Sequence, residues 1–391
     1  MPEGMTTDRH CSSRLPFAVW VAVLVVLVSN TQLSLVTPLI PHYVDRFGIS
    51  PAAAGVFVAL HPVASILASV PAGLVVLRVG SRTTVLVAAL LAAAASIGLG
   101  VSANAAQLFA ARFVNGVVGA GIWAAAFAWL VEVAPRSHRG RALSLGMGAS
   151  AVGGMIGPVI GAAAEATSII GAFAAIAVLF VILGLLVRRQ PSSGSGKQVL
   201  APALFAAMTR PAILPAAVLV SVAGVAFGTV TVVAPLALAR FGAGAAFIGA
   251  TFVCAALAET LISRFAGEVS DRYGYAMPIR IGLLLSAVIA SLIVLPDRPL
   301  VFAAFVVALM SVVYVFLVPS FALFAVVGDR VGLGQGVAFG LTNITWASGY
   351  VVGALLGGVA GTLGVALPGL VIAFLMTLLL FVLRPARLRA E

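Results

Sequence analysis

Three ionisable residues interrupt long apolar stretches of this chain, and they are the side chains best suited to carry chemistry. Glu259, Arg112 and His61 each lie inside a stretch long enough to form a membrane-spanning helix. A charge at bilayer depth costs about 2.5–3.5 kcal/mol on insertion scales, so such a side chain is expected to face the protein interior. Apolar surroundings favour a protonated carboxyl group, whereas a nearby cation favours the ionised form. The pattern predicts proton loading and release at Glu259, with Arg112 and His61 as further coupling candidates.

Each of these residues also has a structural alternative. Glu259 could stay protonated and form a hydrogen bond to a neighbouring helix. Arg112 lies near the start of its apolar stretch, so its long side chain could extend to the membrane surface. His61 directly precedes Pro62 and could be a hydrogen-bonded structural residue. The sequence leaves both sets of roles open.

The composition indicates the elements that must position these residues. Of 391 residues, 62% are hydrophobic and 8% charged, and the mean hydropathy is +1.20. Soluble domains have about a quarter of their residues charged, whereas a spanning helix takes about 20 apolar residues. We therefore predict an all-α integral membrane protein with twelve transmembrane helices in two pseudo-symmetric six-helix bundles. The apolar stretches lie near residues 17–40, 51–76, 83–102, 106–131, 140–163, 168–187, 212–238, 246–266, 277–295, 299–327, 334–361 and 365–383.

Two motifs recur in the second half of the chain, which indicates a duplicated unit. One has the skeleton Gly, four residues, Arg, one residue, Gly, and it occurs as Gly73–Gly80 and again as Gly267–Gly274. The other is a series of glycines at every fourth position, which begins at Gly153 and again at Gly349. The expected organisation is an N-terminal half at 1–190, a cytoplasmic linker rich in Pro, Ser and Gly at 191–210, and a C-terminal half at 211–391.

The net charge of +11 follows the predicted topology and does not indicate nucleic-acid binding. If both termini share one side, that side collects eighteen Lys and Arg residues, and the other holds only Arg46, Arg240 and Arg298. Basic loops face the cytoplasm, so both termini are predicted to be cytoplasmic in a multi-pass plasma (inner) membrane protein. The basic surplus is expected to contact the lipid bilayer.

The motifs resemble those of the major facilitator superfamily, and within it the 12-helix drug:proton antiporter group. Gly73, Arg78, Gly80 and Arg82 match the loop motif G-x-L-A-D-R-x-G-R-K, although Leu77 replaces its acidic residue. The second copy has Gly267, Asp271, Arg272 and Gly274, and so keeps the acid. In the family this loop acts as a conformational latch. The alternative is that these arginines only anchor the topology.

Two further motifs carry the resemblance. Leu108–Gly116 resembles L-x-x-x-R-x-x-Q-G, with Arg112 in place and Asn115 instead of Gln. Gly153, Gly157, Pro158 and Gly161 match the antiporter signature G-x-x-x-G-P-x-x-G, which in the family distinguishes exporters. Small residues at this spacing also serve static helix packing.

The resemblance implies an alternating-access exporter that is proton-coupled and moves hydrophobic or amphipathic small molecules, as in multidrug efflux and drug resistance. An exporter or facilitator of a specific sugar or metabolite is an alternative, because the first helix has no acid. A non-transporting membrane sensor is a second alternative. We expect a monomer with no enzyme activity and no cofactor. No metal site is expected, since four scattered histidines and two distant cysteines form no ligand set. Besides the three ionisable residues, the expected substrate cavity is lined by Asn30, Ser34, Asn115, Trp123, Tyr314, Asn343 and Trp346.

Overall fold

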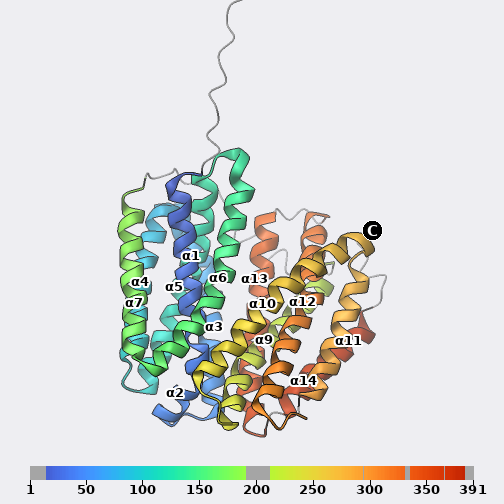
Figure 1. Ribbon diagram of the computed structural model, residues 1–391. Coiled ribbons are helices and arrows are strands. Elements are labelled where there is room, and N and C mark those ends of the chain that lie inside the picture. Colours follow the sequence, from blue (N-terminus) through green and yellow to red (C-terminus); the bar gives the residue numbers. More distant parts are fainter. Residues whose placement is uncertain (1–14, 191–211, 294, 331–334, 365, 384–391) are drawn as a thin grey trace, which may run out of the picture.

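The computed structural model describes residues 15–190, 212–293, 295–330, 335–364 and 366–383, and within these ranges all regular structure is helical (Figure 1). A helix satisfies its backbone hydrogen bonds internally, as an apolar bilayer requires. The predicted linker at 191–210 lies outside the described residues. The first half comprises α1 (Phe17–Leu35), η1 (Thr37–Leu39), α2 (Ile40–Phe47), α3 (Pro51–Val79), α4 (Ser81–Val101), α5 (Ala105–Val133), η2 (Arg136–His138), α6 (Arg139–Ala166) and α7 (Ile169–Arg188).

The second half has six helices among the described residues. Ten spans of the two halves are long and apolar enough to cross a membrane, and α11 and α14 are shorter apolar helices of 17 residues each. The predicted fold class of twelve transmembrane helices is thereby confirmed. The six helices of the second half are α9 (Leu214–Arg240), α10 (Ala245–Tyr273), α11 (Ala276–Leu292), α12 (Pro299–Arg330), α13 (Gln335–Gly361) and α14 (Ala366–Val382).

Two prolines break the first span, which the sequence predicts as one helix to residue 40. Helix α1 ends at Leu35, Pro38 lies in η1, and Pro41 lies in the first turn of α2. Proline has no N–H and clashes with the preceding helical turn, but it is well tolerated where a helix begins. The span therefore continues as a second short helix, which ends at Gly48 with a left-handed backbone (φ 60°).

Polar caps begin three of the first-half helices after very short connections. Ser50, Asn104 and Ser168 accept hydrogen bonds from the backbone N–H groups of Ala53 (3.2 Å), Gln107 (2.9 Å) and Gly171 (3.0 Å). A cap of this kind satisfies one of the donors that the first turn of a helix leaves free. The short connections make consecutive helices antiparallel neighbours.

The buried apolar residues form two separate cores. One is built by α1 to α7 around side chains such as Trp129, Phe173 and Phe180, and it also includes Val232 and Ala354 of the second half. The other is built by α9 to α14 around Phe302, Phe316 and Phe324. Each half is therefore a packed bundle in its own right.

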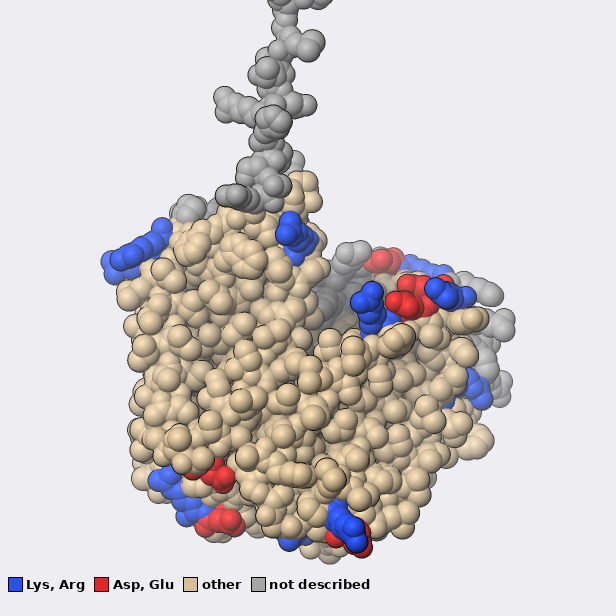
Figure 2. Space-filling view, in the orientation of Figure 1, with Lys and Arg blue, Asp and Glu red and all other residues tan. Residues whose placement is uncertain are grey.

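The outer surface is apolar where lipid would contact it. Leucine and phenylalanine side chains on the outer helices are exposed, for example Leu91 on α4, Leu185 on α7, Leu284 on α11 and Phe381 on α14. Charged residues gather toward the two ends of the molecule, and the belt between them is almost entirely uncharged on the face shown in Figure 2. This distribution suits a bilayer, because a charged side chain in the hydrocarbon core costs free energy.

The two halves meet at one end of the molecule and part at the other. We call the end at which α1 begins the proximal side (top in Figure 1) and the other end the distal side. At the distal side a Cβ on Gly55 of α3 would come within 2.9 Å of the Gly358 Cα of α13, and one on Gly249 within 2.7 Å of the Pro158 carbonyl oxygen. Glu165 of α6 accepts a 3.2 Å hydrogen bond from the backbone N–H of Ala245. On the proximal side the surface is notched between the halves (Figure 2).

Candidate functional site

Arg112 is buried on α5, two turns inside its distal end. Its residue is only 5% exposed, and its Nε and Nη1 atoms have no hydrogen-bond partner among the residues that the structure describes. The guanidinium carbon lies 5.5 Å from the centre of the Phe57 ring, which is a cation–π contact. Tyr43 of α2 and Tyr350 of α13 are close enough to act on it electrostatically. The side chain is therefore held inside the protein.

Glu259 lies at the midpoint of α10, where its carboxyl group interacts with the side chain of Tyr314 of α12. Its Oε1 atom is buried and has no partner in the described part of the chain. The residue as a whole is half-buried, so its carboxyl group is not sealed off inside the protein. The geometry thus suits intermittent protonation.

Aromatic rings connect the surroundings of Glu259 with those of Arg112. Tyr314 contacts Phe227 edge to face with 5.6 Å between ring centres. Phe227 lies 6.5 Å from Trp346, which lies 5.1 Å from Tyr350. Aromatic pairs at such distances are favourable contacts. They form a wall on three helices of the second half, and Tyr350 also packs against the first core.

The structure divides the predicted site residues into two groups. Tyr314 and Trp346 accompany Glu259 in the aromatic wall. Asn115 and His61 accompany Arg112: Asn115 is buried with its Oδ1 unpartnered among the described residues, and His61 interacts electrostatically with Arg112. No ion pair joins Arg112 to Glu259 in the described part of the chain.

The other predicted cavity residues lie elsewhere. The Asn30 amide donates to the Val26 carbonyl oxygen of its own helix (3.0 Å). The Ser34 hydroxyl lies within hydrogen-bonding distance of the Asn30 carbonyl oxygen (2.8 Å) and of the Gly153 carbonyl oxygen on α6 (3.2 Å). Trp123 packs on Phe127 with 4.6 Å between ring centres. Asn343 is exposed on α13. Among the described residues, none of these four forms a ring contact or a side-chain hydrogen bond with the two groups above.

Sequence reasoning missed Tyr43, Phe57, Phe227 and Tyr350. Three of them lie in apolar helices where aromatic residues look like ordinary packing residues. A tyrosine in such a stretch carries a hydroxyl group that needs a partner when buried, and this is the one signal that the sequence offers. Which tyrosine matters follows only from the contacts.

The glycine stripes pack backbone against backbone in each half. On α6 the stripe Gly153, Gly157 and Gly161 faces α1, and on α13 the stripe Gly349 and Gly353 faces α9. A hydroxyl group links the two helices of each pair: Ser34 of α1 donates to the Gly153 carbonyl oxygen of α6 (3.2 Å), and Thr229 of α9 donates to the Gly353 carbonyl oxygen of α13 (3.0 Å). Glycine permits this approach because it has no side chain.

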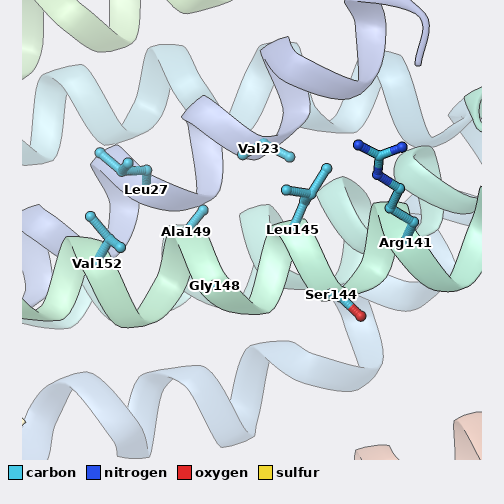
Figure 3. A pocket seen from close by; sticks show the side chains of 8 residues that line it. All are labelled: Val23, Leu27, Arg141, Ser144, Leu145, Gly148, Ala149 and Val152. Atoms are coloured by element: carbon cyan, nitrogen blue, oxygen red, sulfur yellow. The ribbon is translucent and has the colours of Figure 1, made fainter. Parts of the chain in front are cut away.

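Toward the proximal side, α1 and α6 separate and leave an open groove of about 410 Å³ (Figure 3). The positions that continue the glycine stripe on this part of α6 are Ala149, Leu145 and Arg141, and Arg141 lies at one end of the groove. Its lining is mainly apolar and includes none of the predicted cavity residues. It is formed by Val23, Leu27, Arg141, Ser144, Leu145, Gly148, Ala149 and Val152.

The loop motifs have the same backbone geometry in both halves. Gly80 ends α3 with φ 86° and Gly274 ends α10 with φ 76°, a left-handed region that favours glycine. Arg82 donates through Nε to the Val187 carbonyl oxygen (3.1 Å), which links α4 to α7. Arg78, Asp271 and Arg272 are exposed at the proximal side, where the halves are apart.

The first loop has Leu77 at the acidic position of the motif, whereas the second loop keeps Asp271. We therefore predict that the second loop carries most of the latch. Asp271→Asn should reduce transport several-fold, because a carboxylate stabilises a helix N-terminus by about 0.3–1 kcal/mol or pairs with a cation. Leu77→Asp should improve transport less than Asp271→Asn impairs it. Initial transport rates of the variants at equal membrane levels test this. Equal and negligible effects would mean that both loops only anchor the topology.

The sequence profile of the Major Facilitator Superfamily matches residues 22–354. The chain belongs to this superfamily. It is thus a multi-pass membrane transporter and not an enzyme. Multidrug resistance protein 2 of Bacillus subtilis is 23% identical over 378 residues, covering 90% of this chain and 92% of that protein. Multidrug resistance protein 1 of the same organism is 28% identical over 169 residues, which cover 42% and 43%.

An uncharacterized MFS-type transporter of Schizosaccharomyces pombe is 27% identical over 175 residues. The matches to this protein and to Multidrug resistance protein 1 each cover about two fifths of the relative's length. Among solved structures, a bacterial homologue of the human lysosomal transporter Spinster superposes in two inward-facing conformations. The unoccupied one gives a TM-score of 0.73 at 14% identity over 96% of this chain and 93% of that chain. The occupied one gives 0.76 at 14% identity over 95% and 97%.

Proposed function

We propose that this transporter is a proton-coupled exporter of hydrophobic or amphipathic small molecules. The observation that carries the proposal is Glu259, the one acidic side chain midway along a spanning helix in the described part of the chain. Among the described residues its carboxyl group interacts with Tyr314 alone, and it borders the aromatic wall, where an apolar substrate would find ring surfaces. The names of the B. subtilis relatives support multidrug transport, and the Gly157–Pro158 signature supports export as its direction.

Alternating access provides the mechanism. The halves touch at the distal side through Gly55 and Gly358 and are parted at the proximal side, as one of two end states requires. Rocking the two packed bundles about this contact would open the distal side and close the proximal one. The protein acts as a monomer in this proposal, moving protons one way and a small-molecule substrate the other.

A specific sugar or metabolite is the second candidate, suggested by the absence of an acid from α1. The polar side chains of α1 are engaged, however: Gln32 donates to the Ala92 carbonyl oxygen (3.4 Å), and Asn30 and Ser34 bond within the helix pair α1 and α6. A sugar site needs free hydrogen-bonding groups. This arrangement favours the apolar substrate class.

Transport itself tests the proposed function. Expression in a host that lacks its own exporters, followed by a susceptibility screen, identifies candidate substrates. In proteoliposomes, an imposed pH gradient should then drive accumulation of the same compound against its concentration gradient. Resistance without pH-driven accumulation would contradict proton coupling. Accumulation of a sugar but of no amphipathic compound would contradict the substrate class, and a chain that moves nothing would be a sensor.

The charge distribution predicts the orientation in the plasma membrane. Arg46, Arg240 and Arg298 lie at distal helix ends, and the basic residues of the other described loops lie at proximal ends. The positive-inside rule makes the proximal side cytoplasmic. A reporter active only in the cytoplasm should therefore give full signal when fused after Arg389 and background signal when fused in the loop at Asp297. The reverse pattern would overturn the orientation.

A further inference from the structure

Two buried hydrogen-bond donors of the first half lie close together and have no partner among the described residues. They are the Arg112 guanidinium, through Nε and Nη1, and the Tyr43 hydroxyl group, in residues only 5% and 2% exposed. Both side chains rest on one ring, because Arg112 lies over Phe57 and Tyr43 meets Phe57 edge to face with 5.8 Å between ring centres. Leaving a buried donor unpaired costs about 1–3 kcal/mol, and more for a charged group.

No acidic side chain in the described part of the first half compensates this charge. Among residues 15–190 the acids are Asp45, Glu132 and Glu165, all near helix ends. Asp45 is exposed, Glu132 accepts a hydrogen bond from Ser81, and Glu165 accepts one from Ala245. A buried cation without a counter-ion is strongly unfavourable, so this site is incomplete as the protein alone provides it.

The groups around Arg112 can supply further donors. Asn115 lies about one turn further along α5. His61 interacts electrostatically with Arg112, and so does Tyr350 from the other half. A guanidinium group offers forked N–H donors that match a carboxylate or phosphate, and hydroxyl, amide and imidazole groups can add to them. The cluster thus has the chemistry of an oxyanion receptor.

Its place in the fold connects it with transport. Tyr43 lies in α2, Phe57 in the second turn of α3, and Arg112 near the distal start of α5. Gly55, two residues before Phe57, belongs to the contact that closes the distal side. Tyr350 also continues into the aromatic wall through Trp346. Apolar ring surface therefore begins directly beside the cationic group.

We propose that Arg112 and Tyr43 bind the anionic headgroup of an amphipathic substrate, namely a carboxylate, phosphate or sulfonate, while the aromatic wall receives its apolar part. This inference rests on the proposed function and specifies its substrate class. It assigns Arg112 to the substrate and leaves the proton to Glu259.

Equilibrium binding to the purified protein in phosphatidylcholine nanodiscs, without any gradient, tests the site. The probes are octanoate and octyl phosphate, with octan-1-ol and octyltrimethylammonium as controls of equal chain length and sodium phosphate as the free anion. The anionic amphiphiles should bind about tenfold or more tightly than either control, as charge-assisted bonds require. Arg112→Gln should remove that advantage, and Tyr43→Phe should reduce it about three- to tenfold while keeping the ring on Phe57.

Matched variants at exposed positions serve as controls. Tyr273→Phe removes a hydroxyl group at the proximal end of α10, and Arg280→Gln removes a guanidinium group on α11. Both should leave binding of the anionic probes unchanged. Equal affinity for all four alkyl probes would overturn the proposal, as would unchanged anion affinity in Tyr43→Phe and Arg112→Gln. Sodium phosphate that competes as strongly as octyl phosphate would reveal a free-anion site and overturn the assignment to a substrate.

The proposed function can fail separately from this inference. Binding of octyl phosphate that depends on Arg112, together with no pH-driven transport of any compound, would disprove proton-coupled export but leave the anion site intact. Coupled export of neutral and cationic amphiphiles with no anion preference in binding would disprove the anion site alone.

Discussion

Glu259→Gln is expected to abolish pH-driven uphill export while substrate exchange down a gradient survives. Glutamine keeps the size of the side chain and its ability to bond Tyr314, but it cannot take up or release a proton. If the carboxyl group carries the proton, the accumulation ratio should fall to the value measured without a pH gradient. Proteoliposomes loaded with substrate, with and without an imposed pH gradient, measure both activities in one preparation.

Glu268→Gln provides the matched control on the same helix. Glu268 is exposed and forms only a 3.6 Å ion pair with Arg264, so this variant should keep coupled export. Exposed pairs of this kind contribute little to stability. Accumulation against the gradient by Glu259→Gln would show that Glu259 is structural and that another group titrates.

Gly157→Ala is expected to disrupt the packing of α6 on α1 and, with it, both stability and transport. A Cβ atom at this position would come within 2.5 Å of the Thr31 carbonyl oxygen and 2.7 Å of the Leu35 nitrogen. Both are backbone atoms, so the helices must move apart. Overpacking of this kind costs about 1–3 kcal/mol, and transport falls further if the pair must slide between states. The melting temperature in detergent and the initial transport rate measure the two effects.

Gly154→Ala isolates the steric cause. Gly154 lies on the same helix, three residues earlier, and a Cβ atom there would meet nothing within 4 Å. Its replacement by alanine should therefore keep the melting temperature and the transport rate near those of the unaltered protein, with a small gain from alanine's helix propensity. Similar behaviour of the two variants would show that α1 and α6 are not in tight contact.

Much of the fold could be predicted from the sequence, because a bilayer imposes length and apolarity on every span. The helical stretches follow from this rule, and the repeated Gly80 and Gly274 mark the same left-handed helix end in both halves. The stripe from Gly153 to Gly161 indicates close helix packing, although only the structure identifies α1 as its partner. The break after Leu35 could not be predicted, because it depends on how the chain turns between Pro38 and Pro41.

The candidate site was only partly predictable, and the reason is physical. Glu259 and Arg112 are conspicuous in the sequence because charges are rare in apolar helices. Their partners are not, since a helix surrounded by lipid and other helices is apolar on all sides and its periodicity does not show which face turns inward. The sequence by itself determined which side chains need a partner. Only the tertiary structure, by bringing α2, α3 and α5 around one ring and α10 against α12, decided that Tyr43 shares Phe57 with Arg112, that Tyr314 lies beside Glu259, and that the two charges have separate neighbours.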